Sequence, residues 1–311
     1  MFNAGLRKGT YTDPLTGTPT PIFFWYPTTT AESDAGPGPF QLPLAADAPP
    51  AAGALAAVVI SHGSGGSHFA HRDTATTLAR SGFVVAVPLH ARNSFLDSSD
   101  VGTLRSYQDR PRQISAAIDA MLAQPLLGER IDAERIGAMG FSGGAYGVLV
   151  AAGGIAQLSL MGQHCEAHPD DAFCIGGRQA GYSFPDDDPD GLVVSVEPDR
   201  RIRAAVLMAP LGIVFGEGSL ARVDIPVRLY RAEHDESLTS PFHVERVREL
   251  LPRPPEYAVA AGGGHFAFIS PFPPGIGGEA AIDPPGFDRA AYQALFNAEV
   301  CDFFSRTLRQ A

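Results

Sequence analysis

The sequence has few basic residues and no long apolar run. Its 311 residues include 23 Lys and Arg against 34 Asp and Glu, a formal net charge of −11. No run of Lys or Arg supplies the positive charge that a phosphate backbone requires, which argues against nucleic acid as a partner. The longest apolar runs, such as residues 55–60, are far shorter than the roughly 20 residues needed to cross a bilayer, so no membrane span is expected.

Cysteine is equally scarce. The three cysteines, Cys165, Cys174 and Cys301, are too few for a disulfide scaffold. Cys165 and Cys174 can pair if the protein is exported, or stay reduced in the cytoplasm. Residues 1–9 lack a basic start followed by an apolar stretch, so no secretory signal is visible. The expected location is cytoplasmic, or periplasmic or secreted if the first Met replaces a removed signal peptide.

What the sequence does contain is an alternation of strand and helix patterns, with 45% hydrophobic residues to form a core. This alternation predicts an α/β fold with a mostly parallel central sheet and helices on both faces. Strands are expected at residues 5–11, 19–27, 55–62, 83–89, 135–141, 202–209, 226–232 and 256–260, the first two as a hairpin. Apolar spacing of three and four residues predicts helices at 70–81, 108–123, 145–152, 241–251 and 288–309.

Two segments depart from this alternation. Residues 30–54 are rich in Pro, Ala and Gly, a composition that predicts a surface loop outside the core. Residues 155–200 are rich in Gly, Pro, His and Asp, and we interpret them as an inserted lid or cap. No other linker interrupts the pattern, so residues 1–311 are expected to form a single domain.

The clearest motif lies between the third of the central strands and its helix. Gly140-Phe141-Ser142-Gly143-Gly144 fits G-x-S-x-G, the nucleophile elbow. A strand that turns abruptly into a helix holds its Ser at strained dihedral angles, so the positions two residues away on each side must lack side chains. Ser142 is therefore the expected nucleophile. The alternative is a glycine-rich turn in which Ser142 only caps the helix.

In this fold the acid and then the base follow the nucleophile along the chain. His265 comes after the last predicted strand and a run of three glycines, so it is the expected general base, ahead of His243 and His234. Asp235 follows the strand before that one, where a short carboxylate can hold the imidazole in the correct tautomer. Glu233 and Asp224 are the alternative acids.

The attack on a carbonyl group builds negative charge on oxygen, which fixed N–H groups stabilise. One donor is expected from Gly143, directly after the nucleophile. The second is expected from the glycine-rich loop at residues 62–67, where Ser64 is our choice and Gly65 the neighbouring one. His62 is interpreted as a side chain that braces this loop, and the alternative is a loop with no catalytic part.

These motifs resemble the predicted dienelactone hydrolases and the platelet-activating-factor acetylhydrolase-like esterases, within the α/β-hydrolase superfamily. The resemblance covers residue 5 to the end, apart from 30–54, and includes residues 165–174. It rests on Val59-Ile60-Ser61-His62-Gly63-Ser64-Gly65-Gly66, Pro88-Leu89-His90-Ala91-Arg92-Asn93, Arg110-Pro111-Arg112-Gln113-Ile114, Gly140-Phe141-Ser142-Gly143-Gly144 and Gly264-His265-Phe266. It implies a Ser-Asp-His ester hydrolase of the α/β-hydrolase fold without an organic cofactor. True dienelactone hydrolases have Cys where this chain has Ser142, which argues against a dienelactone substrate.

Two patterns suggest metal ions. Asp186, Asp188, Asp190, Gly191 and Glu197 match the EF-hand loop pattern, although Pro185 and Pro189 and the absence of flanking helices favour an acidic turn. Four histidines, His62, His68, His71 and His90, lack a zinc-ligand spacing. We therefore expect no metal in the active site and treat calcium at 186–197 as the less favoured reading.

The function predicted from the sequence is hydrolysis of a small-molecule carboxylic ester through an acyl-enzyme. Within hydrolases, the alternatives are a lipase or polyester-degrading enzyme and an amidase. Outside them, the alternatives are a non-catalytic binding module on a hydrolase fold and a calcium-regulated binding protein. Only the 186–197 pattern favours the last of these.

Overall fold

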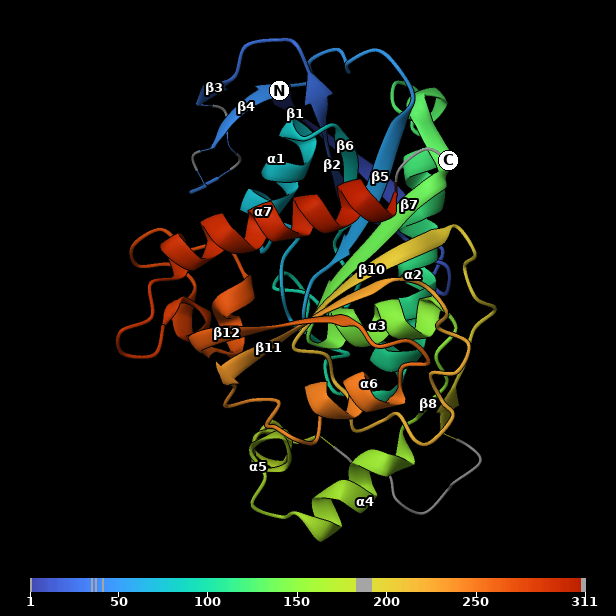
Figure 1. The fold of residues 1–311 in the computed structure, drawn as a ribbon, viewed down its shortest axis with the longest axis vertical. Helices are drawn as coiled ribbons and strands as arrows, with labels where there is room; N and C mark the ends of the chain where they lie inside the picture. The colour runs from blue at the N-terminus through green and yellow to red at the C-terminus, as the bar shows by residue number, and fades with distance from the viewer. Residues whose placement is uncertain (1, 35, 37, 41, 183–191, 309–311) are drawn as a thin grey trace.

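The computed structural model describes residues 2–34, 36, 38–40, 42–182 and 192–308 (Figure 1). The strands are β1 (Asn3–Thr12), β2 (Pro19–Thr28), β3 (Ser33–Asp34), β4 (Pro43–Ala46), β5 (Leu55–Ser61), β6 (Phe83–Pro88), β7 (Ile131–Phe141), β8 (Ala156–Gln157), β9 (Val193–Val194), β10 (Ile202–Met208), β11 (Val227–His234) and β12 (Glu256–Gly264). The α-helices are α1 (Arg72–Arg80), α2 (Leu104–Leu122), α3 (Gly143–Ala151), α4 (Ser159–Ala167), α5 (Ala172–Gln179), α6 (Val244–Leu250) and α7 (Arg289–Thr307). Short 3-10 helices are η1 (Gly128–Arg130), η2 (His265–Phe268) and η3 (Gly278–Ala281).

The large sheet has the strand order β12-β11-β10-β7-β5-β6-β2-β1-β4-β3. The six strands from β12 to β6 are parallel, and the β1–β2 hairpin joins them through an antiparallel β2–β6 pair. The predicted mostly parallel sheet and the predicted hairpin are therefore confirmed. In a parallel sheet the carboxyl ends of the strands share one edge, and ligands bind in that region.

Helices cover both faces of the sheet, and each face has its own core. Along β5, Ala57 and Val59 belong to the core that contains residues of α2, α3 and α6, whereas Val58 and Ile60 belong to the core that contains residues of α1 and α7. This alternation follows from the two-residue period of a strand that is buried on both sides. In Figure 1, α7 crosses in front of the sheet. None of the helices in the described ranges is both long enough and apolar enough to cross a bilayer.

Helix α2 begins four residues before the predicted start at residue 108. Thr103 caps it by accepting a hydrogen bond from the Ser106 N–H. Pro111 lies inside the helix and cannot donate to the carbonyl group of Tyr107 one turn earlier. The Tyr146 hydroxyl group donates to that carbonyl oxygen instead, at 3.2 Å. A tertiary contact thus compensates for the proline, and the local pattern could not reveal it.

Residues 30–54 differ from the predicted surface loop. Strand β4 lies within them and pairs in parallel with β1. Leu44 of β4 is fully buried in the core that contains α1 and α7. The prediction that this composition contributes nothing to a core was therefore wrong, because the pairing of β4 with β1 places Leu44 in the core.

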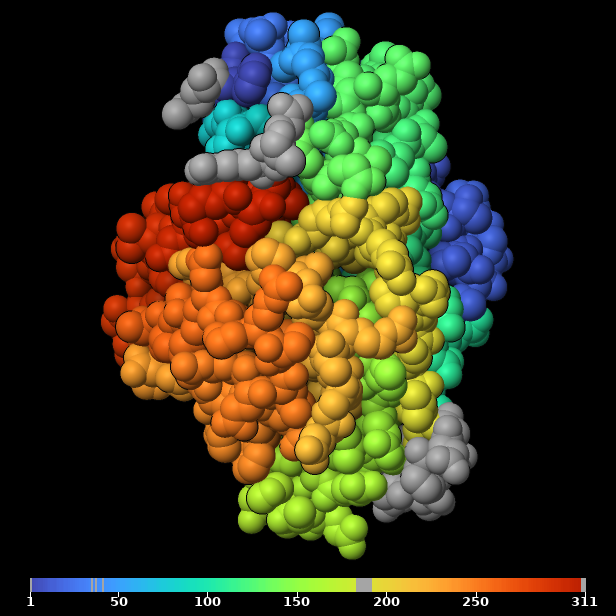
Figure 2. All heavy atoms as spheres, turned by 45° about the vertical axis from the view of Figure 1, so that its right-hand side comes forward, coloured from blue at the N-terminus to red at the C-terminus, as the bar shows by residue number. Residues whose placement is uncertain are grey.

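Residues 155–200, which we interpret as an insert and call by that name below, contain β8, α4, α5 and β9 in their described part. Strands β8 and β9 form a separate two-stranded sheet, and Cys165 of α4 forms a disulfide bond with Cys174 of α5. Figure 2 shows the yellow-green part of the insert at one end of the molecule, beside orange residues of the C-terminal half. The two helices of the insert are thus tied to each other covalently.

Candidate active site

Ser142 occupies the corner between β7 and α3. Its backbone angles are φ 54° and ψ −120°, which a residue with a side chain rarely adopts. A Cβ atom on Gly140 would lie 2.5 Å from the Gly144 carbonyl oxygen, and one on Gly144 would collide with the Ser61 carbonyl oxygen. Both glycines are therefore needed for the turn. The turn leaves Ser142 partly exposed at the carboxyl edge of the sheet.

Asp235 and His265 directly follow the neighbouring strands β11 and β12. The His265 Nδ1 atom lies 2.9 Å from Asp235 Oδ2 and 3.0 Å from Oδ1. An ionised carboxylate only accepts, so this contact places the ring proton on Nδ1 and leaves Nε2 able to accept. The His265 ring centroid lies 4.8 Å from that of Phe141, the residue before Ser142. The chain thus brings an oriented imidazole to the corner that carries Ser142.

The acid of this pair is held in its charged form. Burial alone raises the pKa of Asp235, but the attraction of the imidazolium form of His265 and several hydrogen bonds outweigh burial, so the pKa lies below the usual 3.8. The Leu238 and Ser237 N–H groups donate to Oδ1 at 2.7 and 3.0 Å. The carboxylate therefore remains an acceptor for the imidazole at neutral pH.

The alternative acids and bases make other contacts. Glu233 accepts a hydrogen bond from a backbone N–H of the glycine run at 2.7 Å, and Asp224 forms an exposed ion pair with Arg253. His243 is buried, and its Nδ1 accepts a backbone N–H at 3.3 Å. Asp235, the first choice from the sequence, is the carboxylate that contacts the His265 ring.

The loop after β5 faces the start of α3. An ideal Cβ atom on Gly143 would lie 3.7 Å from the Ser64 nitrogen atom. The Gly65 N–H group donates to Asn93 Oδ1 at 2.9 Å, whereas the Ser64 N–H group has no acceptor among the described residues. Gly143 opens a helix, so its N–H has no partner one turn earlier. This arrangement favours Ser64 over Gly65 as the second oxyanion donor.

Several buried polar residues next to this loop had no role assigned from the sequence. His90, Asn93, Arg110 and Gln113 all lie in the motifs that carried the family resemblance, which is the one signal that pointed to them. The Arg110 guanidinium donates to the His62 carbonyl oxygen at 2.5 Å. Burial lowers the pKa of Arg110 to about 10, so it remains a cation at neutral pH.

The insert touches loops on both sides of the site. Asp171, the residue that caps α5, accepts a short hydrogen bond from the Thr239 hydroxyl group in the loop after Asp235. On the other side, the Tyr182 ring packs so closely on Gly102 that a Cβ atom there would collide with it. The insert therefore bridges the acid loop and the loop that follows β6.

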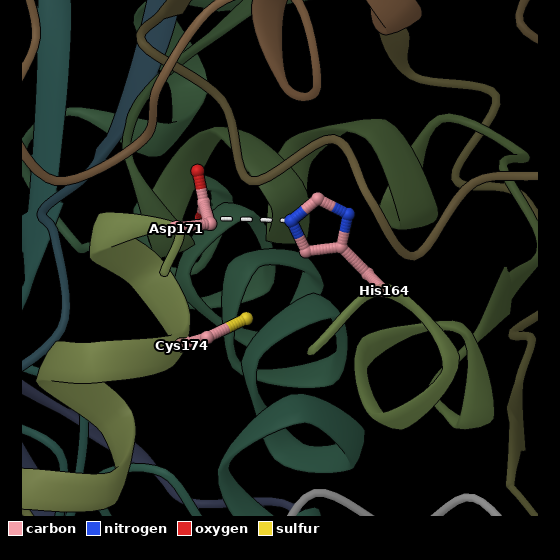
Figure 3. A group of neighbouring side chains, drawn as sticks. All are labelled: His164, Asp171 and Cys174. Atoms are coloured by element: carbon pink, nitrogen blue, oxygen red, sulfur yellow. Dashed lines mark ion pairs between the residues drawn. The ribbon is translucent and has the colours of Figure 1, made fainter. Parts of the chain in front are cut away.

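One group of side chains in the described residues has the composition of a metal site, and Figure 3 shows it. His164, Asp171 and Cys174 place their ligand atoms within 4.8 Å of one another. The His164 Nε2 atom lies 3.5 Å from Asp171 Oδ1, and Cys174 is bonded to Cys165. Because metals bind the thiolate form of cysteine, the disulfide removes the third ligand. Burial lowers the pKa of His164 below the usual 6.5, so the group is a polar His–Asp contact beside a disulfide.

The two metal patterns of the sequence have different outcomes. Residues 183–191 hold most of the EF-hand pattern and lie outside the described residues, and only Glu197 of its five positions is described. The four histidines at 62, 68, 71 and 90 do not form a group with ligand atoms close enough for one ion in the part of the chain that the structure describes.

Comparisons with known proteins agree with the fold. Residues 45–165 match the model of the dienelactone hydrolase family, which supports a hydrolase at the family level. A search of curated proteins finds no match to the chain. The fold is similar to a ferulic acid esterase from Streptomyces cinnamoneus, with a TM-score of 0.64, 18% sequence identity, and coverage of 100% of this chain and 91% of that one. The chain thus has an α/β-hydrolase fold and is similar to the dienelactone hydrolase family.

Proposed function

We propose that the protein is a serine esterase that hydrolyses carboxylic esters through an acyl-enzyme on Ser142. The observation that carries this proposal is the strained corner at Ser142 beside the Asp235–His265 pair. A strained elbow exposes a serine hydroxyl, and an imidazole held by a carboxylate is the base that activates it. The match to the dienelactone hydrolase family supports the same class of reaction.

In the first step, Ser142 Oγ attacks the ester carbonyl carbon while His265 Nε2 takes the hydroxyl proton. The resulting oxyanion accepts hydrogen bonds from the N–H groups of Ser64 and Gly143. When the bond to the alcohol oxygen breaks, His265 returns the proton to the leaving alcohol. Asp235 stays ionised throughout and stabilises the imidazolium form of His265.

In the second step, His265 removes a proton from a water molecule, which attacks the acyl-enzyme. The second tetrahedral intermediate collapses, Ser142 regains its proton from His265, and the carboxylic acid leaves. These proton transfers use the chain's own side chains and require no organic cofactor.

Replacement of Ser142 tests this proposal. We expect S142A to lower kcat on p-nitrophenyl esters by about 10³ to 10⁶-fold, the range seen when a triad nucleophile is removed. A fluorophosphonate probe should label the wild type and spare the variant, which also tests the alternative of a non-catalytic binding module. Near-native ester turnover by S142A would refute the assignment. Faster cleavage of anilides than of matched esters would favour the amidase alternative.

A second candidate function, action on water-insoluble esters as in a lipase or polyester hydrolase, has one specific observation in its favour. Phe95 is 58% exposed and its neighbour Leu96 is 65% exposed. The Phe95 N–H group donates to the Gly66 carbonyl oxygen at 2.9 Å, so this apolar tip is fixed directly to the proposed oxyanion loop. An exposed apolar tip beside a catalytic loop suits contact with an apolar surface.

The matched test compares two pairs of exposed apolar residues. We expect F95S/L96S to lower the ratio of activity on emulsified long-chain ester to activity on a soluble short-chain ester by about fivefold. This factor corresponds to about 1 kcal/mol, because partial burial of the two side chains recovers only part of the roughly 1.5 to 3 kcal/mol that complete burial of one is worth. The control I282S/L295S changes residues that are 71% and 69% exposed elsewhere on the surface. Equal ratios in both variants would argue against this candidate.

A further inference from the structure

The proposed oxyanion donor belongs to a peptide group that is held from behind. The Ser64 N–H and the Gly63 carbonyl form one peptide unit, and the two groups point in opposite directions in a trans peptide. The His62 Nδ1 atom lies 2.7 Å from the Gly63 oxygen, and the Gly66 N–H donates to the same oxygen at 3.1 Å. Two donors therefore fix this peptide on the side away from the oxyanion.

The His62 ring has one tautomer that satisfies its contacts. The backbone N–H of His90 lies 3.1 Å from His62 Nε2 and can only donate, so Nε2 must be the unprotonated acceptor. The proton of the neutral ring is then on Nδ1, where it donates to the Gly63 carbonyl oxygen. His62 is thus both held by the His90 backbone and directed at the oxyanion peptide.

The His90 side chain is fixed in turn by a chain of hydrogen bonds that starts at a carboxylate. Asp13 Oδ2 accepts from Gln113 Nε2 at 2.6 Å, and Gln113 Oε1 contacts His90 Nδ1 at 2.8 Å. His90 Nε2 contacts the Ser61 hydroxyl group at 2.8 Å. Because the carboxylate only accepts, every donor follows: the amide of Gln113, then Nδ1–H of His90, then the hydroxyl of Ser61. All four side chains are buried.

The charges around these rings keep them neutral and the carboxylate ionised. Burial, and after it the charge of Arg110, holds the pKa values of His62 and His90 well below the usual 6.5. Burial raises the pKa of Asp13, but hydrogen bonds from Thr16, Gln113 and a backbone N–H outweigh it and bring the pKa below 3.8. Because the rings are neutral and their protons are fixed, all donors in this series of hydrogen bonds point toward Asp13.

We propose that His62 and Asp13 are positioning residues of the oxyanion hole, through this directed chain of buried hydrogen bonds. The inference rests on the proposed esterase function, and it deepens that function by adding two residues that do not touch substrate. Asp13 lies in the β1–β2 turn, outside residues 45–165 that match the family model. The N-terminal hairpin therefore contributes to catalysis by fixing His90, whose backbone holds His62.

The tautomers are measured directly by ¹⁵N NMR of the histidine rings in the wild-type protein at pH 7. We expect neutral rings protonated on Nδ1 for both His62 and His90, and an Nε2–H or doubly protonated His62 would overturn the proposal. In D13N, the backbone N–H groups of Leu15 and Thr16 retain the side-chain oxygen, so the new amide nitrogen faces Gln113. The Gln113 amide must then flip, and the His90 proton moves to Nε2. An unchanged His90 tautomer in D13N would overturn the role of Asp13.

Kinetics test the consequence for catalysis. We expect H62A to lower kcat by about 10 to 100-fold with KM within about threefold, because loss of one oxyanion donor costs about 10² to 10³-fold and acts on the transition state. H62N keeps an N–H that can reach Gly63 and should recover about tenfold of kcat over H62A. The control H71A removes another buried histidine, and we expect it to lower stability with kcat within about threefold.

Two outcomes would overturn the kinetic part: unchanged kcat in H62A, or equal kcat in H62N and H62A. If H62A does not fold, H62N is compared with the wild type instead. A kcat of H62N equal to that of H71A would then count against the proposal. If the wild type shows no turnover that depends on Ser142, the proposed function fails. The NMR measurement still decides whether the directed chain exists.

Discussion

The oxyanion side and the acid side of the proposed active site differ in how charge is arranged around their histidines. On the oxyanion side, His62 and His90 are buried and kept neutral, and the nearest link to a carboxylate runs through a glutamine. On the acid side, the ionised Asp235 contacts the His265 ring directly. An N–H donor only has to stay in place, so fixed dipoles suffice. A general base has to change its charge in each cycle, so a carboxylate beside it is needed.

The largest effect is expected on the acid side. In D235N, the Ser237 and Leu238 N–H groups keep the side-chain oxygen at the Oδ1 position, so the amide nitrogen faces His265 Nδ1. That contact favours the tautomer with the proton on Nε2, which cannot accept the proton of Ser142. We expect kcat to fall by about 10⁴-fold, as in a triad whose acid becomes an amide.

Steady-state kinetics together with circular dichroism measure this effect on a folded variant. The comparison predicts that D235N loses far more activity than H62A, because proton transfer fails altogether whereas the oxyanion donor is only misplaced. A smaller loss in D235N than in H62A would reverse the relative weight of the two sides.

The second prediction concerns the disulfide bond in the insert, the segment that contacts both the acid loop and the loop after β6. Cys165 and Cys174 are nine positions apart, so the bond closes a short loop, for which chain entropy predicts a contribution of at most about 3 kcal/mol. We expect C165S/C174S to unfold locally around α4 and α5 before the sheet does. Limited proteolysis with mass spectrometry should show new cleavage within residues 155–182, and C301S, which removes the free cysteine, should not. Unchanged cleavage in the double variant would contradict this.

The response to acid separates buried histidines from the buried aspartate. Burial lowers the pKa of His71, which follows the oxyanion loop, to about 4. Between pH 6.5 and 4 the unfolded chain binds a proton that the folded ring does not, so stability falls as pH falls through this range. Asp235 has a folded pKa below 3.8, so its contribution is lost only at still lower pH.

Urea unfolding at pH 7.5 and 5.0 measures this difference. We expect H71F to reduce the wild-type loss of stability between these values by about 2 kcal/mol, from 1.36 kcal/mol per pKa unit. D235N should show the same loss as the wild type over this range. An identical loss in H71F and the wild type would mean that the His71 ring is protonated in the folded protein.

Sequence patterns reached the parts of this molecule that depend on local rules. The strand period, the glycines at 140 and 144, and the position of Asp235 and His265 after consecutive strands could all be predicted, and the contact between these two side chains agrees with that prediction. Asp13 could not, because its partner Gln113 is 100 positions away and the contact depends on how the hairpin packs on β6. The burial of Leu44 escaped prediction for the same reason, since it depends on pairing with β1.

The smallest expected effect concerns the contact between the insert and the acid loop. T239V removes the hydroxyl group that donates to Asp171 and keeps the shape of the side chain. One hydrogen bond is worth about 1 kcal/mol, so we expect the free energy of unfolding to fall by about that amount. T307V removes a hydrogen bond of a hydroxyl group within α7 and is the matched control for stability.

Because Asp235 is held by His265 and two backbone N–H groups, kcat of T239V should stay within about threefold of the wild type. A tenfold loss of kcat in T239V alone would show that the insert helps to align the acid. The acid side and the oxyanion side of the site would then be coupled through the insert. They could no longer be treated as two independently held groups of residues.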